Sequence, residues 1–217
     1  MPSTSPEPVE GRTVVLATNN AKKLVELRRL VAAAGADVRV LGLGDLPPYP
    51  EPAETERTFV GNALLKARAA VAATGLPALA DDSGIAVDVL NGMPGVRSAR
   101  WSGPDATDAS NNALLMAQLD DVADEDRTAR FEAGVALVLP DGRERTTTGR
   151  MDGRLLRGPV GDNGFGYDPL FVADGQTVSN GVLDADAKDA ISHRGRAVRA
   201  MVPVLVEVLT ERSAEEA

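Results

Sequence analysis

The stretch RTVVLATNNAKKLVELRRLVAAAGADVRVL, residues 12–41, decides the fold of this chain. Its valine-rich start, residues 12–17, predicts a short buried strand. Apolar residues at helical spacing then predict a helix over 23–34, which ends at Gly35. A second strand is expected at 38–41. Together these segments predict a β-α-β unit whose two strands lie parallel.

Helix and strand signals continue along the rest of the chain. Residues 42–56 form a proline-bearing loop, and loops of this length in a compact domain usually have a function. A hairpin is expected where 130–139 and 145–150 flank the turn Pro140-Asp141-Gly142. The other predicted elements are helices at 59–74 (capped by Thr58), 105–119 and 187–209, the last broken or bent at Gly195 and Pro203, and a strand at 85–90. The fold class is therefore α/β with a mixed sheet.

Length and composition limit the possible classes of protein. We expect one domain over 11–210, with a disordered tail at 1–10 and a flexible tail at 211–217. The net charge of −9 disfavours nucleic acid and anionic membranes as partners, because an acidic surface repels them. Without cysteine there is no disulfide, thiolate zinc site or thiol nucleophile. The polar start lacks the regions of a signal peptide and no apolar run reaches membrane-spanning length, so we expect a cytoplasmic protein.

The chain uses lysine sparingly, with four lysines among its 23 basic residues. Two of them, Lys22 and Lys23, lie at the start of the first predicted helix, after Thr18-Asn19-Asn20-Ala21. Cations in a first helical turn oppose the positive end of the helix dipole, and a bound anion removes that conflict. The segment therefore indicates phosphate binding, although it lacks the spacing of a Walker P-loop. An ordinary capped helix is the alternative.

Acidic residues suggest a site for a divalent cation. Asp81 and Asp82 are adjacent, and neighbouring side chains of an extended segment point to opposite sides, so one of the two is expected to enter a given site. With Glu54 on the long loop, that carboxylate could hold Mg²⁺, which prefers a few carboxylates together with water and phosphate oxygens. A solvated turn at Asp81-Asp82-Ser83-Gly84 is the alternative. A catalytic triad is disfavoured, since there is one histidine and no nucleophile elbow.

Three further segments carry polar or aromatic residues of interest. Thr58, Asn62 and Lys66 recur every fourth residue on the second helix, as either its wet face or a stripe toward the metal. Residues 161–169, GDNGFGYDP, place two aromatic rings among glycines, which suits either a stacked nucleobase or a packed turn. Residues 188–196, KDAISHRGR, add cations and the single histidine.

This set of residues resembles the inosine/xanthosine triphosphate pyrophosphatase family, enzymes that hydrolyse deaminated purine nucleotides. Four blocks match in order across about residues 12–207: ATNNAKKLVEL, ETERTFVGNALLKA, ADDSGIAVDVLNGMPGVRSARWSG, and GFGYDPLF with AISHRG. The departures are Asn19, where glycine is common, and the extra residues before 12. The resemblance implies a two-lobed protein around a central substrate cleft, a Mg²⁺ cofactor and a homodimer.

The resemblance also implies a role for individual residues. Glu54 and Asp82 would bind Mg²⁺, and Asp82 would position or deprotonate the attacking water. Arg194 is expected to read the 6-keto oxygen of the base, and Phe165 to stack on the ring. The remaining substrate-binding residues would be Thr18, Asn20, Lys23, Lys66, Ser83, Gly166, Tyr167, Asp168, Lys188 and His193.

The implied reaction is attack of water on the α-phosphate of dITP, ITP or XTP, which yields the nucleoside monophosphate and pyrophosphate. Such a reaction needs charge neutralisation and an activated water, but no covalent nucleophile. Two alternatives remain. A Maf-type pyrophosphatase would share the chemistry and take pyrimidine nucleotides, against which the GFGYD and SHR segments argue. A non-enzymatic nucleotide-binding regulator would need the lysines, but not Glu54 together with Asp82.

Overall fold

The β-α-β unit at the start of the chain is confirmed. In the computed structural model, which describes residues 12–33 and 38–215 apart from the side chains of Lys22, Lys23, Leu27 and 212–215, β1 (Thr13–Leu16) leads through α1 (Ala21–Ala33) to β2 (Arg39–Gly42). The two strands are parallel, with Val14 opposite Val40. The predicted helix end at Gly35 and the predicted tail at 1–10 lie outside the described residues.

Six described strands form one mixed sheet in the order β2-β1-β3-β4-β5-β6. The remaining strands are β3 (Ala78–Val87), β4 (Thr128–Val138), β5 (Glu144–Leu155) and β6 (Phe171–Ala173). β3 runs parallel to β1, and the pairs from β3 to β6 are antiparallel. The hairpin predicted around Pro140-Asp141-Gly142 joins β4 to β5, and Gly142 has the positive φ of 88° that its turn requires.

One strand is longer than the sequence indicated. Asp81-Asp82-Ser83-Gly84 lies inside β3 and not in a turn, because every residue of β3 pairs with β4 across an antiparallel register. The strand predicted at 85–90 thus ends at Val87, and Asp88–Leu90 forms the 3₁₀ helix η2. The turn signal of Asp-Ser-Gly was overridden by pairing with an apolar neighbouring strand.

Helices cover both faces of the sheet and its far end. They are α2 (Phe59–Thr74), α3 (Asp108–Gln118), α4 (Ala185–Ile191) and α5 (His193–Glu215), with short 3₁₀ turns η1 (Leu43–Asp45), η3 (Gly95–Arg100), η4 (Asp124–Asp126) and η5 (Asp168–Leu170). The Thr58 cap is confirmed, since its side chain accepts a hydrogen bond from the Gly61 N–H at 3.0 Å. Among the described residues, no helix combines the length and the apolar character needed to cross a bilayer.

The last predicted helix is two helices. The break falls at Ser192, which is extended with ψ 150° and whose hydroxyl accepts a hydrogen bond from the Gly195 N–H at 2.8 Å. That bond satisfies a donor in the first turn of α5, so a new helix begins there. The predicted break at Gly195 was therefore placed three residues late, and α5 continues through Pro203.

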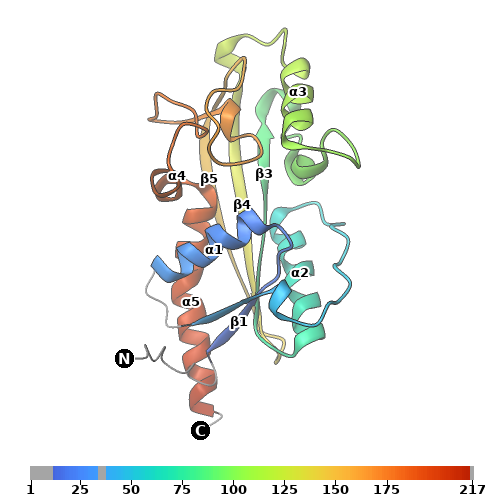
Figure 1. Cartoon of the computed structure of the whole chain (residues 1–217), viewed down its shortest axis with the longest axis vertical. Helices are drawn as coiled ribbons and strands as arrows, with labels where there is room; N and C mark the ends of the chain where they lie inside the picture. Colours follow the sequence, from blue (N-terminus) through green and yellow to red (C-terminus); the bar gives the residue numbers. More distant parts are fainter. Residues whose placement is uncertain (1–11, 34–37, 216–217) are drawn as a thin grey trace, which may run out of the picture.

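Three apolar clusters hold the layers together, and Figure 1 shows how the elements that carry them are arranged. One packs α1 and α5 against the sheet through residues such as Leu137 and Met201, and a second packs α2 on the opposite face through residues such as Ala67 and Ala136. The third, which includes Leu115 of α3 and Phe171 of β6, fills the other half of the molecule. The expected two-lobed arrangement therefore has one lobe of α/β/α layers and one built on α3 and the long strands.

Strand alternation and topology together place the site. Along β3, Ala80 and Asp82 face α2, whereas Asp81 and Ser83 face α1 and α5. β1 pairs with only the first two residues of β3, Ala78 and Leu79. The rest of this edge of β3 is not paired with β1, so other parts of the chain can approach it. The chain leaves β1 toward β2 on one side and returns to β3 on the other. Such a switch point creates a crevice at the carboxyl end of β1, where ligands commonly bind in α/β sheets.

Candidate active site

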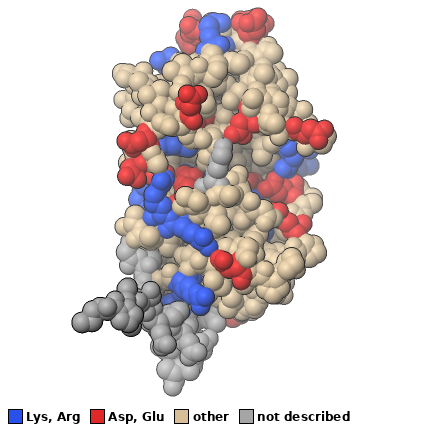
Figure 2. All heavy atoms as spheres, in the orientation of Figure 1, with Lys and Arg blue, Asp and Glu red and all other residues tan. Residues whose placement is uncertain are grey.

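A cavity of 380 Å³ occupies this crevice, a size within the roughly 300–1,000 Å³ typical of ligand pockets. Figure 2 shows this face of the molecule hollowed across its middle, with acidic and basic side chains around the hollow. The cavity collects residues from both lobes. Its lining includes the following predicted site residues: Thr18, Asn20, Glu54, Lys66, Asp82, Ser83, Phe165, Gly166, Tyr167, Asp168, Lys188, His193 and Arg194.

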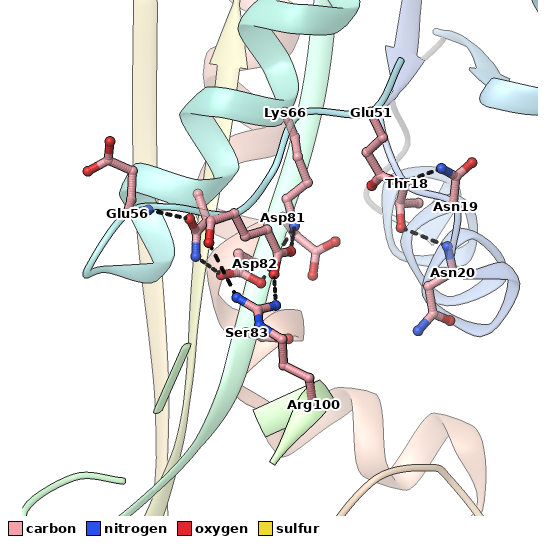
Figure 3. A network of polar contacts seen from close by, with 12 residues as sticks. Thr18, Asn19, Asn20, Glu51, Glu56, Lys66, Asp81, Asp82, Ser83 and Arg100 are labelled. Carbon is pink, nitrogen blue, oxygen red and sulfur yellow. Dashed lines mark hydrogen bonds and ion pairs between the residues drawn. The ribbon is translucent and has the colours of Figure 1, made fainter. Parts of the chain in front are cut away.

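Two carboxylates meet around one ammonium group at one end of the cavity (Figure 3). Lys66 Nζ lies 2.9 Å from Glu54 Oε1 and 3.5 Å from Asp82 Oδ1. Asn62 Nδ2 donates to Asp82 Oδ2 at 2.9 Å, so Asn62 and Lys66 of the predicted stripe face the acids, whereas Thr58 is exposed and caps α2. Arg100 Nη1 contacts Glu54 Oε2 at 2.5 Å from the opposite lobe. The acidic pair is thereby fixed by α2 and by η3.

These contacts determine the charge states of the cluster. Burial by itself raises the pKa of Glu54, but Lys66 and Arg100 together outweigh it and hold that pKa below the ordinary value. For Lys66, burial lowers the pKa, and the nearby Asp82, Asp81 and Glu54 outweigh burial and raise it. Glu54 is therefore ionised and Lys66 protonated at neutral pH. A carboxylate held ionised in a cleft is suited to binding cations.

The cluster also fits a divalent metal ion. One cationic atom, Lys66 Nζ, lies within 3.5 Å of oxygens from both Glu54 and Asp82, so a single cation can be close to both carboxylates. Among the described residues no three His, Cys, Asp or Glu side chains are grouped to hold a metal. A metal bound here would also need oxygen ligands from water and substrate. Mg²⁺ is commonly coordinated in this way, by one or two carboxylates together with water and phosphate oxygens.

The segment after β1 lines the cavity as predicted. Thr18 Oγ1 accepts a hydrogen bond from the Asn20 N–H at 3.2 Å, which turns the chain at the start of α1. Asn19 is bound to Glu51 of the long loop at 2.5 Å. Lys23 is within α1, but its side chain lies outside the described part of the structure. Its predicted phosphate contact therefore stays a prediction.

The aromatic end of the cavity is built around Phe165. Lys188 Nζ lies 4.8 Å from the centre of the Phe165 ring and the Arg194 guanidinium 5.4 Å from it. Asp168, which is 2% exposed, accepts from Lys188 Nζ at 2.5 Å and from the Phe165 N–H at 2.9 Å. Asp168 thus fixes both the loop and the lysine. Both cations are attracted to the electron-rich face of the ring, so they help to fix the position of Phe165.

Arg194 is tied into a buried network on the α1 and α5 face. Its Nε donates to Asp81 Oδ2 at 3.1 Å, its Nη2 donates to Ser83 Oγ at 2.8 Å, and its Nη1 contacts Glu26 Oε2. Burial lowers the pKa of Arg194, but Asp81 and Glu26 outweigh it and raise the pKa. Alternation along β3 thus gives the two adjacent aspartates different duties, as expected: Asp82 lines the cavity and Asp81 anchors Arg194.

His193 and Tyr167 are held by the walls of the cavity. The His193 ring stacks on Phe131 with centroids 4.9 Å apart and an interplanar angle of 12°. The Tyr167 hydroxyl donates to the Ser98 carbonyl at 2.9 Å, and burial raises its pKa. Tyr167 is therefore a neutral donor that joins its loop to η3. Both residues line the cavity while being packed against the protein.

Sequence reasoning missed several functional contacts. Arg100, Glu26 and Asp108 were not singled out, because each belongs to a segment whose pattern indicates only a turn or a helix surface. Their importance depends on what lies opposite them in space, such as Glu54 opposite Arg100. The isolated position of Asp108 after Thr107 indicates a capped helix start, which it is, and gives no hint of the cavity.

The fold and cleft define a class: an α/β protein whose switch-point cavity has a carboxylate pair with a lysine at one end and an aromatic ring close to two cations at the other. Comparisons narrow this class. The Ham1 family matches residues 14–204, and the chain belongs to this family.

Similar proteins cover nearly the whole chain. The dITP/XTP pyrophosphatase of Nocardia farcinica is 59% identical over 193 residues, which are 88% of this chain and 94% of that protein. The dITP/XTP pyrophosphatase of Frankia alni is 59% identical over 202 residues, 91% of this chain and 98% of that protein. Among solved structures, a HAM1 protein from Coxiella burnetii matches with a TM-score of 0.82 at 39% identity, covering 90% of this chain and 98% of that one. The crystal structure of a nucleoside-triphosphatase / dITP/XTP pyrophosphatase from Mycobacterium abscessus matches with a TM-score of 0.73 at 50% identity, covering 88% and 99%.

Proposed function

We propose that this protein hydrolyses deaminated purine nucleoside triphosphates (dITP, ITP and XTP) to the monophosphate and pyrophosphate. The observation that carries the proposal is the layout of one cavity. Phe165 with Lys188 and Arg194 lies at one end, and Glu54, Asp82 and Lys66 lie at the other. An aromatic base and a charged phosphate chain need these two environments at the same time. The names of the relatives support the same substrate class.

In this proposal the phosphate end of the cavity performs the chemistry. Asp82 holds a water molecule against the α-phosphorus and accepts its proton as the new P–O bond forms. The anhydride P–O bond to the β-phosphate breaks, and pyrophosphate leaves with the bonding electrons. Lys66 stabilises the charge that builds on the phosphate oxygens, together with Thr18, Asn20, Ser83 and Lys23.

We also propose Mg²⁺ as the cofactor, held by Glu54 and Asp82. When bound, the ion would neutralise phosphate charge and make the water more acidic. Lys66, whose ammonium group contacts both carboxylates, would also contact the phosphate oxygens. Arg100 would remain on the other oxygen of Glu54.

Base selection in this proposal depends on hydrogen-bond donors. Arg194 would donate to the 6-keto oxygen of hypoxanthine or xanthine, with His193 and Lys188 nearby. The amino group at the same position in adenine cannot accept, so a buried donor would lose its partner at a cost of about 1–3 kcal/mol. Asp168 would hold Lys188, and Gly166 and Tyr167 would shape the loop around the base.

Assembly and location are further parts of the proposal. We expect a homodimer, by resemblance to the family, and a cytoplasmic location, where the nucleoside triphosphate pool is found. Nucleic acid is not an expected partner of a chain with a net charge of −9. Light scattering on the eluted protein would report a mass of two chains, and a mass of one chain would overturn the dimer.

A substrate panel tests the proposed activity. Purified protein would be given dITP, XTP, dATP, dGTP, dCTP or dTTP, with Mg²⁺ or with EDTA, while monophosphate, pyrophosphate and orthophosphate are measured. The expected result is pyrophosphate release from dITP and XTP that requires the metal. Orthophosphate release would contradict attack at the α-phosphate. Binding of dITP without turnover would favour the regulator instead.

A further inference from the structure

Gly166, which follows Phe165 in the cavity wall, is hydrogen-bonded to two side chains of α3. Asp108 Oδ2 accepts a hydrogen bond from the Gly166 N–H at 2.9 Å, and Asn112 Nδ2 donates to the Gly166 carbonyl at 3.0 Å. The two residues are four apart, so they lie one turn apart on the same side of the helix. The backbone N–H and carbonyl of Gly166 are thus both hydrogen-bonded to a helix outside the loop.

The loop needs such an anchor because glycines flank Phe165. Gly164 and Gly166 have positive φ values of 75° and 63°, a region open mainly to glycine. Glycine accesses many other conformations as well, so the segment would lose a large conformational entropy to place the ring. Within the loop Asp168 accepts from the Phe165 N–H at 2.9 Å. The two hydrogen bonds from α3 fix the backbone of Gly166, the residue that follows Phe165.

The helix is rigid enough to act as a support. Its side chain Leu115 is fully buried, and Thr107 and Ser110 form a capping box at its start. Asn112 is 8% exposed, and its Oδ1 is buried without a hydrogen-bond partner in the described structure. An apolar residue would avoid that cost, so the amide is best explained by the hydrogen bond its Nδ2 donates.

We propose that Asp108 and Asn112 are positioning residues for substrate, which set the place of Phe165 through Gly166. This inference rests on the proposed function, in which Phe165 stacks on the base. Stacking contributes to the ground state and the transition state alike, so its loss raises KM and leaves kcat nearly unchanged. Every base has an aromatic face, so the preference for dITP over dATP is also kept.

The variants D108A, D108N and N112A test the proposal on the full chain. D108A removes the acceptor and is expected to raise KM for dITP about tenfold, as the loss of one hydrogen bond to a charged group allows. D108N keeps an oxygen that can accept from Gly166 and is expected to stay within about twofold of the parent. N112A removes the donor and should raise KM about threefold to tenfold. Q118A is the matched control, because Gln118 on the same helix bonds Trp101 and not Gly166.

A double-mutant cycle with F165A separates positioning from other roles. If Asp108 acts through the ring, D108A adds nothing in the F165A background, whereas independent effects multiply. Binding of a dITP analogue with a methylene between the α- and β-phosphates, measured by calorimetry, should weaken in parallel. Multiplying effects in the cycle, or a D108N variant as poor as D108A with an altered dITP-to-dATP ratio, would overturn the proposal and make Asp108 a direct substrate contact. No dITP turnover by the parent protein would instead contradict the proposed function itself.

Discussion

Asp82 is placed by alternation on β3 so that one oxygen receives Asn62 and the other faces Lys66 across 3.5 Å. We expect the variant D82N to lose turnover of dITP by about 10²–10⁴-fold, the usual contribution of a general base, while dITP still binds. Asn is close in shape and can keep a hydrogen bond to Asn62, so folding should be preserved. Single-turnover kinetics and calorimetry would measure the two effects.

The exposed turn residue Asp141 offers a matched control for this substitution, since D141N also exchanges a carboxylate for an amide. It should leave kcat and KM unchanged. Near-parental turnover by D82N would remove Asp82 from the catalytic role, and loss of activity in both variants would point to net charge instead.

Glu54 carries a pH-dependent share of stability in the metal-free protein. Its pKa is lowered in the folded state by Lys66 and Arg100, which outweigh burial. A carboxylate with a depressed folded pKa stabilises the fold above its unfolded pKa of about 4.3, and this contribution disappears as the pH falls through the folded value. Replacing Arg100 by Gln brings the two pKa values closer together, so the variant loses part of this stabilisation.

The difference in unfolding free energy between parent and R100Q is therefore expected to be constant above about pH 6 and to shrink below about pH 4. Urea unfolding in EDTA at several pH values measures it. R145Q is the control, because the exposed Arg145 donates to the backbone carbonyl of Glu144 and not to a carboxylate. A difference that stays the same at acid pH would mean that Arg100 does not act through the ionised Glu54.

At the scale of elements, β5 approaches α5 closely at a glycine. A methyl group on Gly149 would lie 2.0 Å from the carbonyl oxygen of His193, at the start of the helix that also carries Arg194. Backbone cannot yield cheaply, so G149A should cost about 1–3 kcal/mol of stability by overpacking. It should also lower kcat/KM for dITP, because two residues of the cavity move with the helix. Denaturant unfolding and kinetics on one preparation test both effects.

Gly44 provides the matched control for G149A, since nothing lies within 4 Å of its missing methyl group and its φ is not in the left-handed region. G44A should stay within about 0.5 kcal/mol of the parent. Equal stability of G149A and the parent would show that α5 can shift without cost.

The sequence predicted elements better than it predicted their boundaries. The β-α-β unit and the hairpin follow from apolar periodicity and turn residues, which act locally. The extension of β3 through Asp81 to Gly84 depends on pairing with β4, some fifty residues away, and no local signal records that pairing. The break at Ser192 depends on a single hydroxyl serving as a cap, where glycine and proline were the stronger signals.

At the scale of the whole molecule, the candidate residues come from five separated segments and meet at the switch point between β1 and β3, where the chain goes to β2 on one side of β1 and to β3 on the other. The residue types in these segments were enough to indicate contacts with phosphate, with a metal and with a base. Their partners did not follow from the sequence. Arg194 pairs with Glu26 and Asp81, and Arg100 pairs with Glu54. These residues are far apart in the chain, and no spacing or motif in the sequence indicates that they meet.

Because the cavity is lined by both lobes, a ligand that fills it should stabilise the molecule as a unit. Ligand that binds only the folded state adds RT ln(1 + [L]/Kd), about 2.7 kcal/mol at one hundred times Kd. We expect the methylene analogue of dITP with Mg²⁺ to raise the unfolding temperature progressively with concentration. EDTA should remove most of this rise, since phosphates and carboxylates would then repel each other across the cleft. The corresponding dATP analogue should give a smaller rise at equal concentration, because it leaves a buried donor unpaired. Equal shifts for both analogues would place base recognition outside this cavity, and a shift unaffected by EDTA would mean that Glu54 and Asp82 do not share a metal with the substrate.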